Sequence, residues 1–126
     1  MELKNKALFR ENCFINGKFI NSLDNKKIEV NNPANLEILG TVPRCGINET
    51  KLAIEAANQA FGSWKLKTAK ERSIVIKKWA QLIEENADDL AKIMTLEQGK
   101  PLTEAKGEIL LGVSYVDFYA EEGKRV

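Results

Sequence analysis

The chain has 126 residues, of which 44% are hydrophobic and 29% charged, a composition typical of a soluble globular protein with one modest core. A net charge of +1 gives no general attraction to nucleic acid or to an anionic membrane. The absence of histidine and the presence of only two cysteines exclude Ser-His and Cys-His dyads and a disulfide framework, and disfavour a metal site. The charged N-terminus and the lack of a long apolar run predict a cytoplasmic location.

The first third of the chain alternates short β-prone runs with turn residues. Asn16-Gly17 separates the first two runs, and this dipeptide supplies the positive φ angles of a two-residue hairpin loop. Pro43 and Gly46 close the region. We expect strands at 13–15, 18–20, 27–30 and 37–42.

From residue 47 onward the apolar residues recur at helical spacing, which predicts about four helices. Asn48 is a candidate cap for the first helix, and Gly62-Ser63 its expected stop. Thr68 and Glu71 fit a capping box that opens the second helix. The apolar face expected to be buried on this second helix contains Val75, Ile76, Trp79, Leu82 and Ile83.

The remaining two helices meet at a joint built from terminator and initiator residues. Asn86 can cap the third helix. Gly99 stands where a left-handed cap is needed, and Pro101 suits the first position of the last helix. That helix is expected to run to about Glu122 and to be apolar on two sides, which usually requires two partners. One stripe holds Leu102, Ala105, Ile109, Val113, Val116 and Ala120; the other holds Leu111, Tyr115 and Phe118.

Few residues suggest chemistry of their own. Gly107 and Gly112 have P-loop spacing but stand inside a helical pattern. Cys13 and Cys45 lack an evident base and are interpreted as small, partly buried apolar residues. Glu97 and Lys100 are explained by the helix joint. The sequence therefore predicts no catalytic, cofactor-binding or metal-binding residue.

Several motifs together resemble the beginning of the aldehyde dehydrogenases, and within them the enzymes that oxidise succinate or glutarate semialdehyde. The resemblance covers essentially the whole chain and about the first quarter of a family member. The motifs are Phe14-Ile15-Asn16-Gly17, Asn32-Pro33-Ala34-Asn35, Thr68-Ala69-Lys70-Glu71-Arg72, Thr95-Leu96-Glu97-Gln98-Gly99-Lys100-Pro101 and Phe118-Tyr119-Ala120-Glu121-Glu122-Gly123.

The resemblance implies an α+β segment, with a β-hairpin and short strands before about four helices, that lacks the Rossmann-like core and the catalytic domain. It implies NAD(P)-dependent oxidation of succinate semialdehyde to succinate by the whole enzyme. The nucleophilic cysteine, the glutamate base, the oxyanion-binding asparagine and the glycine-rich cofactor turn of the family all follow this region. Neither Cys13 nor Cys45 matches the nucleophile, so this chain alone is expected to be inactive and to bind no cofactor.

By position in the family, Gly107 and Leu111 would face the aldehyde tunnel. We expect residues 1–126 to form a single segment, β-rich over 1–46 and helical over 47–126. The expected partner is the remainder of the dehydrogenase chain or a second copy, and neither nucleic acid nor a membrane. An alternative is a non-catalytic helical interaction module that dimerises or complements a separate catalytic fragment.

Overall fold

The computed structural model describes residues 2–125, and these form two compact units. One unit is Phe9–Leu66; the other consists of the described residues before and after it. The order of elements confirms the predicted α+β arrangement, with four short strands followed by four helices.

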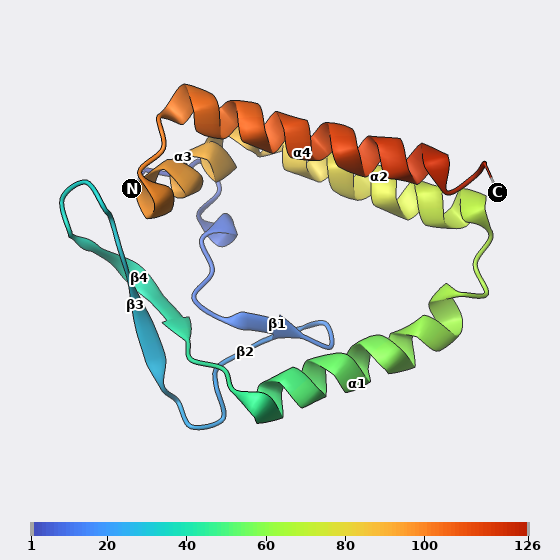
Figure 1. The fold of residues 1–126 in the computed structure, drawn as a ribbon, viewed down its shortest axis with the longest axis horizontal. Helices are drawn as coiled ribbons and strands as arrows, with labels where there is room; N and C mark the ends of the chain where they lie inside the picture. The colour runs from blue at the N-terminus through green and yellow to red at the C-terminus, as the bar shows by residue number, and fades with distance from the viewer. Residues whose placement is uncertain (1, 126) are drawn as a thin grey trace. The chain divides into compact units, whose positions relative to one another are not determined.

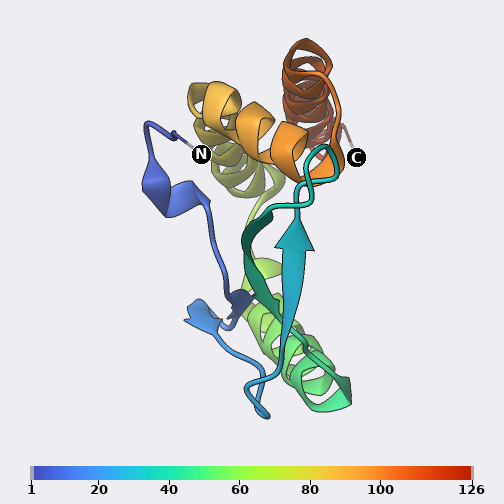
Figure 2. The ribbon, with the colours of Figure 1, turned by 90° about the vertical axis from the view of Figure 1, so that its left-hand side faces the viewer.

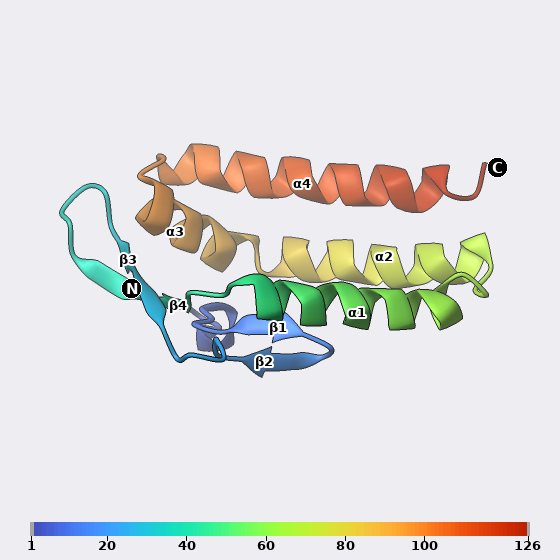
Figure 3. The same ribbon diagram turned by 60° about the horizontal axis from the view of Figure 1, so that its bottom comes forward.

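The unit formed by Phe9–Leu66 contains two β-hairpins and one helix. Strands β1 (Cys13–Ile15) and β2 (Lys18–Ile20) pair antiparallel, with Cys13 opposite Ile20. The loop residues Asn16 and Gly17 have φ angles of 51° and 75°, which confirms the predicted two-residue hairpin turn. This hairpin lies alongside helix α1 (Ile47–Trp64) (Figure 1 and Figure 3).

The second hairpin of this unit is longer and leads into α1. Strands β3 (Lys27–Asn31) and β4 (Ile38–Pro43) pair antiparallel, with a register shift between Val30 and Asn31. The Glu11 carboxylate accepts the backbone N–H of Thr41 at 2.7 Å, and this bond lowers the pKa of Glu11. The segment before β1 is thereby attached to the side of β4.

The start and end of α1 differ from the sequence prediction. Gly46, and not Asn48, is the N-cap residue, and its backbone N–H donates to the Glu49 carboxylate at 2.8 Å. The carboxylate takes this role because, from the third position of the helix, it reaches back to an amide that has no partner within the helix. At the other end the helix continues past Gly62 to Trp64, one residue beyond the predicted stop.

The other unit holds the short 3₁₀ turn η1 (Lys6–Leu8) and three helices. Helix α2 (Ala69–Glu85) opens with the predicted capping box: Thr68 Oγ1 accepts the N–H of Glu71 at 3.2 Å, and the Glu71 carboxylate accepts the N–H of Thr68 at 2.7 Å. Both amide donors at this helix end are therefore satisfied locally.

Helix α3 (Ala87–Gln98) follows α2 after one residue, Asn86. Asn86 is the N-cap by position, but its side chain does not cap α3; its amide donates to the carbonyl of Leu82 in α2 at 2.8 Å. The prediction that the Asn86 side chain caps the start of α3 was therefore wrong. The side chain bonds to the end of α2 instead, because the last carbonyls of that helix also lack helical partners.

The joint between α3 and α4 (Leu102–Glu122) was predicted closely. Gly99 has φ 81° and donates its N–H to the carbonyl of Thr95 at 2.9 Å, as expected of a left-handed C-cap. Pro101 precedes the first helical residue and is the N-cap, one position earlier than expected.

Helix α4 packs against both α2 and α3 (Figure 1 and Figure 2). The buried residues along these contacts are mainly small. On α2, Ile76 and Ile83 are half-buried, whereas Val75, Trp79 and Leu82 are exposed, so the prediction that the latter three are buried was wrong. The small buried residues of the three helices are Ala80, Ala87, Ala91, Ala105, Val113 and Ala120.

The predicted two-sided apolar character of α4 is visible in the structure. Ala105, Val113 and Ala120 are buried, while Leu111, Tyr115 and Phe118 of the second stripe are exposed. Among the described residues, no helix is both long enough and apolar enough to cross a membrane.

The left-handed cap gives a prediction about stability. Gly99→Ala should lower the free energy of unfolding by about 1–2 kcal/mol, because a Cβ is disfavoured at positive φ. Gly112→Ala is the matched control, since it lies inside α4 with no neighbouring heavy atom within 4 Å of an added Cβ. The control should gain about 0.5–1 kcal/mol from helix propensity. Urea unfolding of the 126-residue chain measures both, and equal effects would contradict the assigned cap.

Candidate functional site

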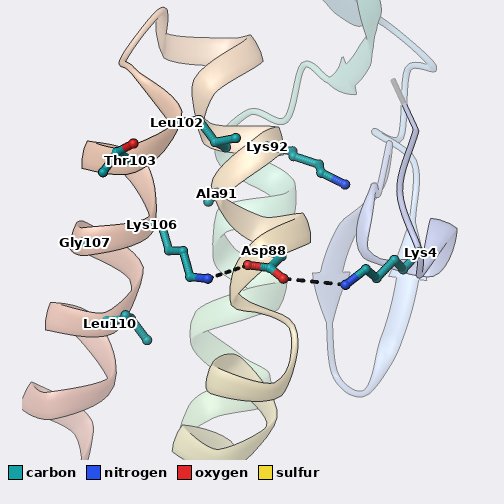
Figure 4. Close-up of a pocket in the computed structure, with 9 residues that line it drawn as sticks. All are labelled: Lys4, Asp88, Ala91, Lys92, Leu102, Thr103, Lys106, Gly107 and Leu110. Carbon is teal, nitrogen blue, oxygen red and sulfur yellow. Dashed lines mark hydrogen bonds and ion pairs between the residues drawn. The ribbon is translucent and has the colours of Figure 1, made fainter.

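A groove with charged walls lies between α3 and α4 (Figure 4). Its volume is about 520 Å³. The first two turns of α4 supply one wall, the beginning of α3 supplies the other, and the N-terminal segment adds one lysine. The lining residues are Lys4, Asp88, Ala91, Lys92, Leu102, Thr103, Lys106, Gly107 and Leu110.

The carboxylate of Asp88 lies between two cations of this groove. Lys106 Nζ is 2.7 Å from one of its oxygens and Lys4 Nζ is 3.5 Å from the other (Figure 4). The hydrogen bond and charge of Lys106, and then the charge of Lys4, lower the pKa of Asp88. Lys92 also lines the groove, but its ammonium pairs with Asp89, so two ammonium groups flank the Asp88 carboxylate.

The N-terminal segment is held against α3 by a second, buried carboxylate. Asp89 is 3% exposed and accepts the backbone N–H of Asn5 at 2.8 Å, which is the main cause of its lowered pKa. Lys92 Nζ lies 3.5 Å from Asp89 and donates to the carbonyl of Glu2 at 3.1 Å. These bonds fix residues 2–5 beside the groove and so place Lys4 in its wall.

Gly107 and Leu111, which their position in the family assigns to the aldehyde tunnel, lie in different surroundings. Gly107 lines the groove, and a Cβ added there would meet no heavy atom within 4 Å. Leu111, one turn later on α4, is 55% exposed and is not among the groove's lining residues. Sequence reasoning missed Lys4, Asp88 and Lys106, because the two lysines looked like ordinary surface charges and Asp88 like a favourable charge at a helix start.

Other positions with possible chemistry have structural surroundings. Gly107 and Gly112 lie within α4, so the backbone N–H groups between them serve the helix and do not form a phosphate loop. Lys100 pairs with Glu108 across the joint. Within residues 2–125, no group of three or more cysteine, aspartate or glutamate side chains could hold a metal ion.

The helix N-termini, which commonly bind phosphate, are occupied or flanked by the chain's own carboxylates. Glu49 accepts the N–H of Gly46 at the start of α1, and Glu71 that of Thr68 at the start of α2. Asp88 and Asp89 occupy the first turn of α3. A phosphate would meet repulsion from these carboxylates at the starts of α1, α2 and α3.

The two cysteines lie close together, which the sequence did not predict, and partial burial was predicted correctly for Cys13 only. Cys13 is half-buried and Cys45 exposed, and their sulfur atoms are 3.2 Å apart. The hydrogen bond with Cys13 raises the pKa of Cys45 to about 11. Neither thiol lines the groove between α3 and α4.

Comparison with known proteins agrees with this arrangement of hairpins and helices. Residues 19–126 match the aldehyde dehydrogenase family, a class of NAD(P)-dependent enzymes. The chain belongs to this family.

Particular relatives extend the match to the whole chain. It is 50% identical to glutarate-semialdehyde dehydrogenase of Pseudomonas putida and 49% identical to the NADP(+) succinate-semialdehyde dehydrogenase of Escherichia coli, in both cases over 126 residues that are 100% of this chain and 26% of the relative. The crystal structure of succinate-semialdehyde dehydrogenase from Burkholderia pseudomallei matches with a TM-score of 0.98 and 48% identity, covering 100% of this chain and 26% of that one. The chain thus spans about a quarter of these relatives, at their N-terminal end.

The ion pairs of the groove give a prediction about acid stability. Because the pKa of Asp88 is lowered in the fold, its charged form stabilises the structure above about pH 4, and this contribution is lost as the pH falls through the lowered pKa. Lys106→Met should raise the pKa of Asp88 toward its ordinary value, as measured by NMR titration of the carboxyl carbon. Lys70→Met, on the exposed side of α2, is the control and should leave it unchanged. An unchanged pKa in Lys106→Met would refute the pairing.

Proposed function

We propose that this chain forms the N-terminal quarter of an NAD(P)-dependent succinate-semialdehyde dehydrogenase. The observation that carries the proposal is the match along the whole chain to solved and curated semialdehyde dehydrogenases, at close to 50% identity and with a TM-score of 0.98. Glutarate semialdehyde is the second candidate substrate, because the Pseudomonas putida relative named for it is as similar as the one named for succinate. Both aldehydes carry a carboxylate at the far end of a short chain.

The contribution of these residues to the enzyme would be scaffold and not chemistry. The apolar stripe of α4 that contains Leu111, Tyr115 and Phe118 is exposed, as are Val75 and Trp79 of α2. Burying such side chains gains about 1.5–3 kcal/mol each, so a covering partner is strongly favoured. We place the remainder of the dehydrogenase chain against these faces, and the cofactor with it, since the helix ends found here repel phosphate.

The aldehyde tunnel of the assembled enzyme would pass the first half of α4. Gly107 leaves open space beside the helix, and Leu111 projects an exposed apolar side chain one turn later. A short aldehyde could pass over the glycine and contact the leucine. A cytoplasmic location for the assembled enzyme stays a prediction from composition.

The alternative function is a helical module that associates through the same apolar faces without supporting catalysis. The exposure of Leu111, Tyr115 and Phe118 on one side of α4 favours association of some kind, with a second copy as one partner. The two functions differ in whether the associated form oxidises an aldehyde.

A complementation experiment distinguishes the dehydrogenase segment from the interaction module. The 126-residue chain alone should produce no NADH or NADPH from succinate semialdehyde, whereas mixing it with the remaining three quarters of the Escherichia coli relative should produce activity measured at the nicotinamide absorbance. The complementing fragment alone is the control. Activity of this chain alone would disprove the scaffold role. A stable dimer by light scattering that yields no activity on mixing would favour the interaction module.

A second experiment tests the tunnel. In the complemented enzyme, Leu111→Ala should lower kcat/KM for succinate semialdehyde about tenfold or more, the usual effect of removing apolar contacts from a substrate pocket. Leu66→Ala is the control, since Leu66 is 81% exposed and lies in the other unit. Equal kcat/KM values for both variants would remove Leu111 from the tunnel.

A further inference from the structure

The contact between the Cys13 and Cys45 sulfurs is built by the surrounding backbone. Cys13 begins β1 and is paired with Ile20 across the hairpin. Cys45 lies in the link between β4 and α1, where its N–H donates to the carbonyl of Pro43 at 3.0 Å. Both segments belong to the same unit. The two sulfurs are 32 residues apart in sequence and 3.2 Å apart in space.

Hydrogen bonds also hold the residues on either side of Cys45. The N–H of Arg44 donates to the carbonyl of Lys26 at 2.8 Å, and the N–H of Gly46 donates to Glu49 at 2.8 Å. The same Glu49 carboxylate accepts the N–H of Leu23 at 2.6 Å, so the link is tied both to the turn before β3 and to the helix start. These bonds hold the backbone of Cys45 in place beside Cys13.

The pair is also open to solvent. Cys45 is exposed and lines a surface cavity of about 350 Å³ together with Lys26, Arg44 and Glu49. A molecule the size of a small organic disulfide can reach this thiol. Lys26 in the lining is paired with Asp24, so two cations and two carboxylates balance each other around the cavity. An inert core cysteine is shielded from reaction by burial, whereas this pair is not.

We propose that Cys13 and Cys45 form a reversible intramolecular disulfide when the chain meets a small-molecule disulfide. One thiol loses its proton and its thiolate attacks the small disulfide, forming a mixed disulfide and releasing one small thiolate. The second cysteine then attacks the protein sulfur of the mixed disulfide, forming the Cys13–Cys45 bond and releasing the second small thiolate. The two protons lost by the cysteines end on the two released thiols, so the protein is oxidised by two electrons and the small disulfide reduced.

Closing the bond needs only a small movement. A disulfide requires a sulfur–sulfur distance of about 2.05 Å, so the sulfurs approach by roughly 1.1 Å from their present separation. The bond would join the start of β1 to the link before α1 and close the chain between them. The raised pKa of Cys45, at about 11, keeps its thiol protonated at neutral pH, so attack by Cys45 itself on a small disulfide is slow.

The test uses the 126-residue chain with oxidised glutathione as the probe. Intact-mass measurement should show loss of two hydrogen atoms, no retained glutathione and no dimer, and dithiothreitol should reverse the change. The oxidised chain should melt about 5–10 °C higher than the reduced one, because the cross-link restricts the unfolded chain. Cys13→Ser/Cys45→Ser should show neither change, and each single variant should retain one glutathione.

A relocated thiol is the matched control. Cys45→Ser/Ser63→Cys keeps two cysteines but moves one to the far end of α1, roughly 24 Å along the helix from its start at 1.5 Å per residue. Its intramolecular bond should form at least about tenfold more slowly. Equal rates in the two chains, stable double glutathione adducts, or cross-linked dimers of the original chain would each overturn the proposal. None of these readouts depends on aldehyde oxidation.

Discussion

The close contact of α4 with α2 and α3 through small side chains is the constraint on which the helical unit depends. The residues Ala105, Val113 and Ala120 of α4, Ala80 of α2 and Ala91 of α3 are all buried, and α4 packs against both α2 and α3. Small side chains let helices approach closely, but they contribute little apolar area each. The large apolar side chains are therefore left on the outer faces. The unit buries few of them, although the sequence is rich in such residues.

Two buried carboxylates connect further segments of the chain, as the alanine contacts connect the helices. Glu49 is 6% exposed and joins the start of α1 to Leu23, and Asp89 joins α3 to Asn5, 84 residues earlier. Each accepts backbone N–H groups, which lower its pKa and offset the cost of burying a charge. Both therefore stabilise the fold above the ordinary carboxyl pKa and lose this contribution as acid protonates them.

What could be predicted from the sequence was local. The turn at Asn16-Gly17, the capping box of Thr68 and the left-handed cap at Gly99 each depend on a few adjacent residues, and each was found as expected. The buried face of α2 was not predicted correctly. Two apolar stripes on this helix fit the same helical period, and only the position of α4 decides which of them is buried. The groove itself was not predicted: Lys4 enters it because the neighbouring Asn5 is bonded to Asp89, which no spacing in the sequence reveals. The assignment of Gly107 to the tunnel stays a prediction from its position in the family.

The geometry of α4 connects the scaffold to the proposed tunnel. At 100° per residue, Leu111, Tyr115 and Phe118 lie on the side of the helix roughly opposite Ala105 and Val113. A helix that is clamped along one side by close contacts presents its other side in a fixed orientation, because protein interiors resist small displacements. The alanine contacts on one side of α4 thus set where Leu111 points on the other side. In the proposed enzyme, the packing of this N-terminal segment would in this way orient the side chain that the substrate passes.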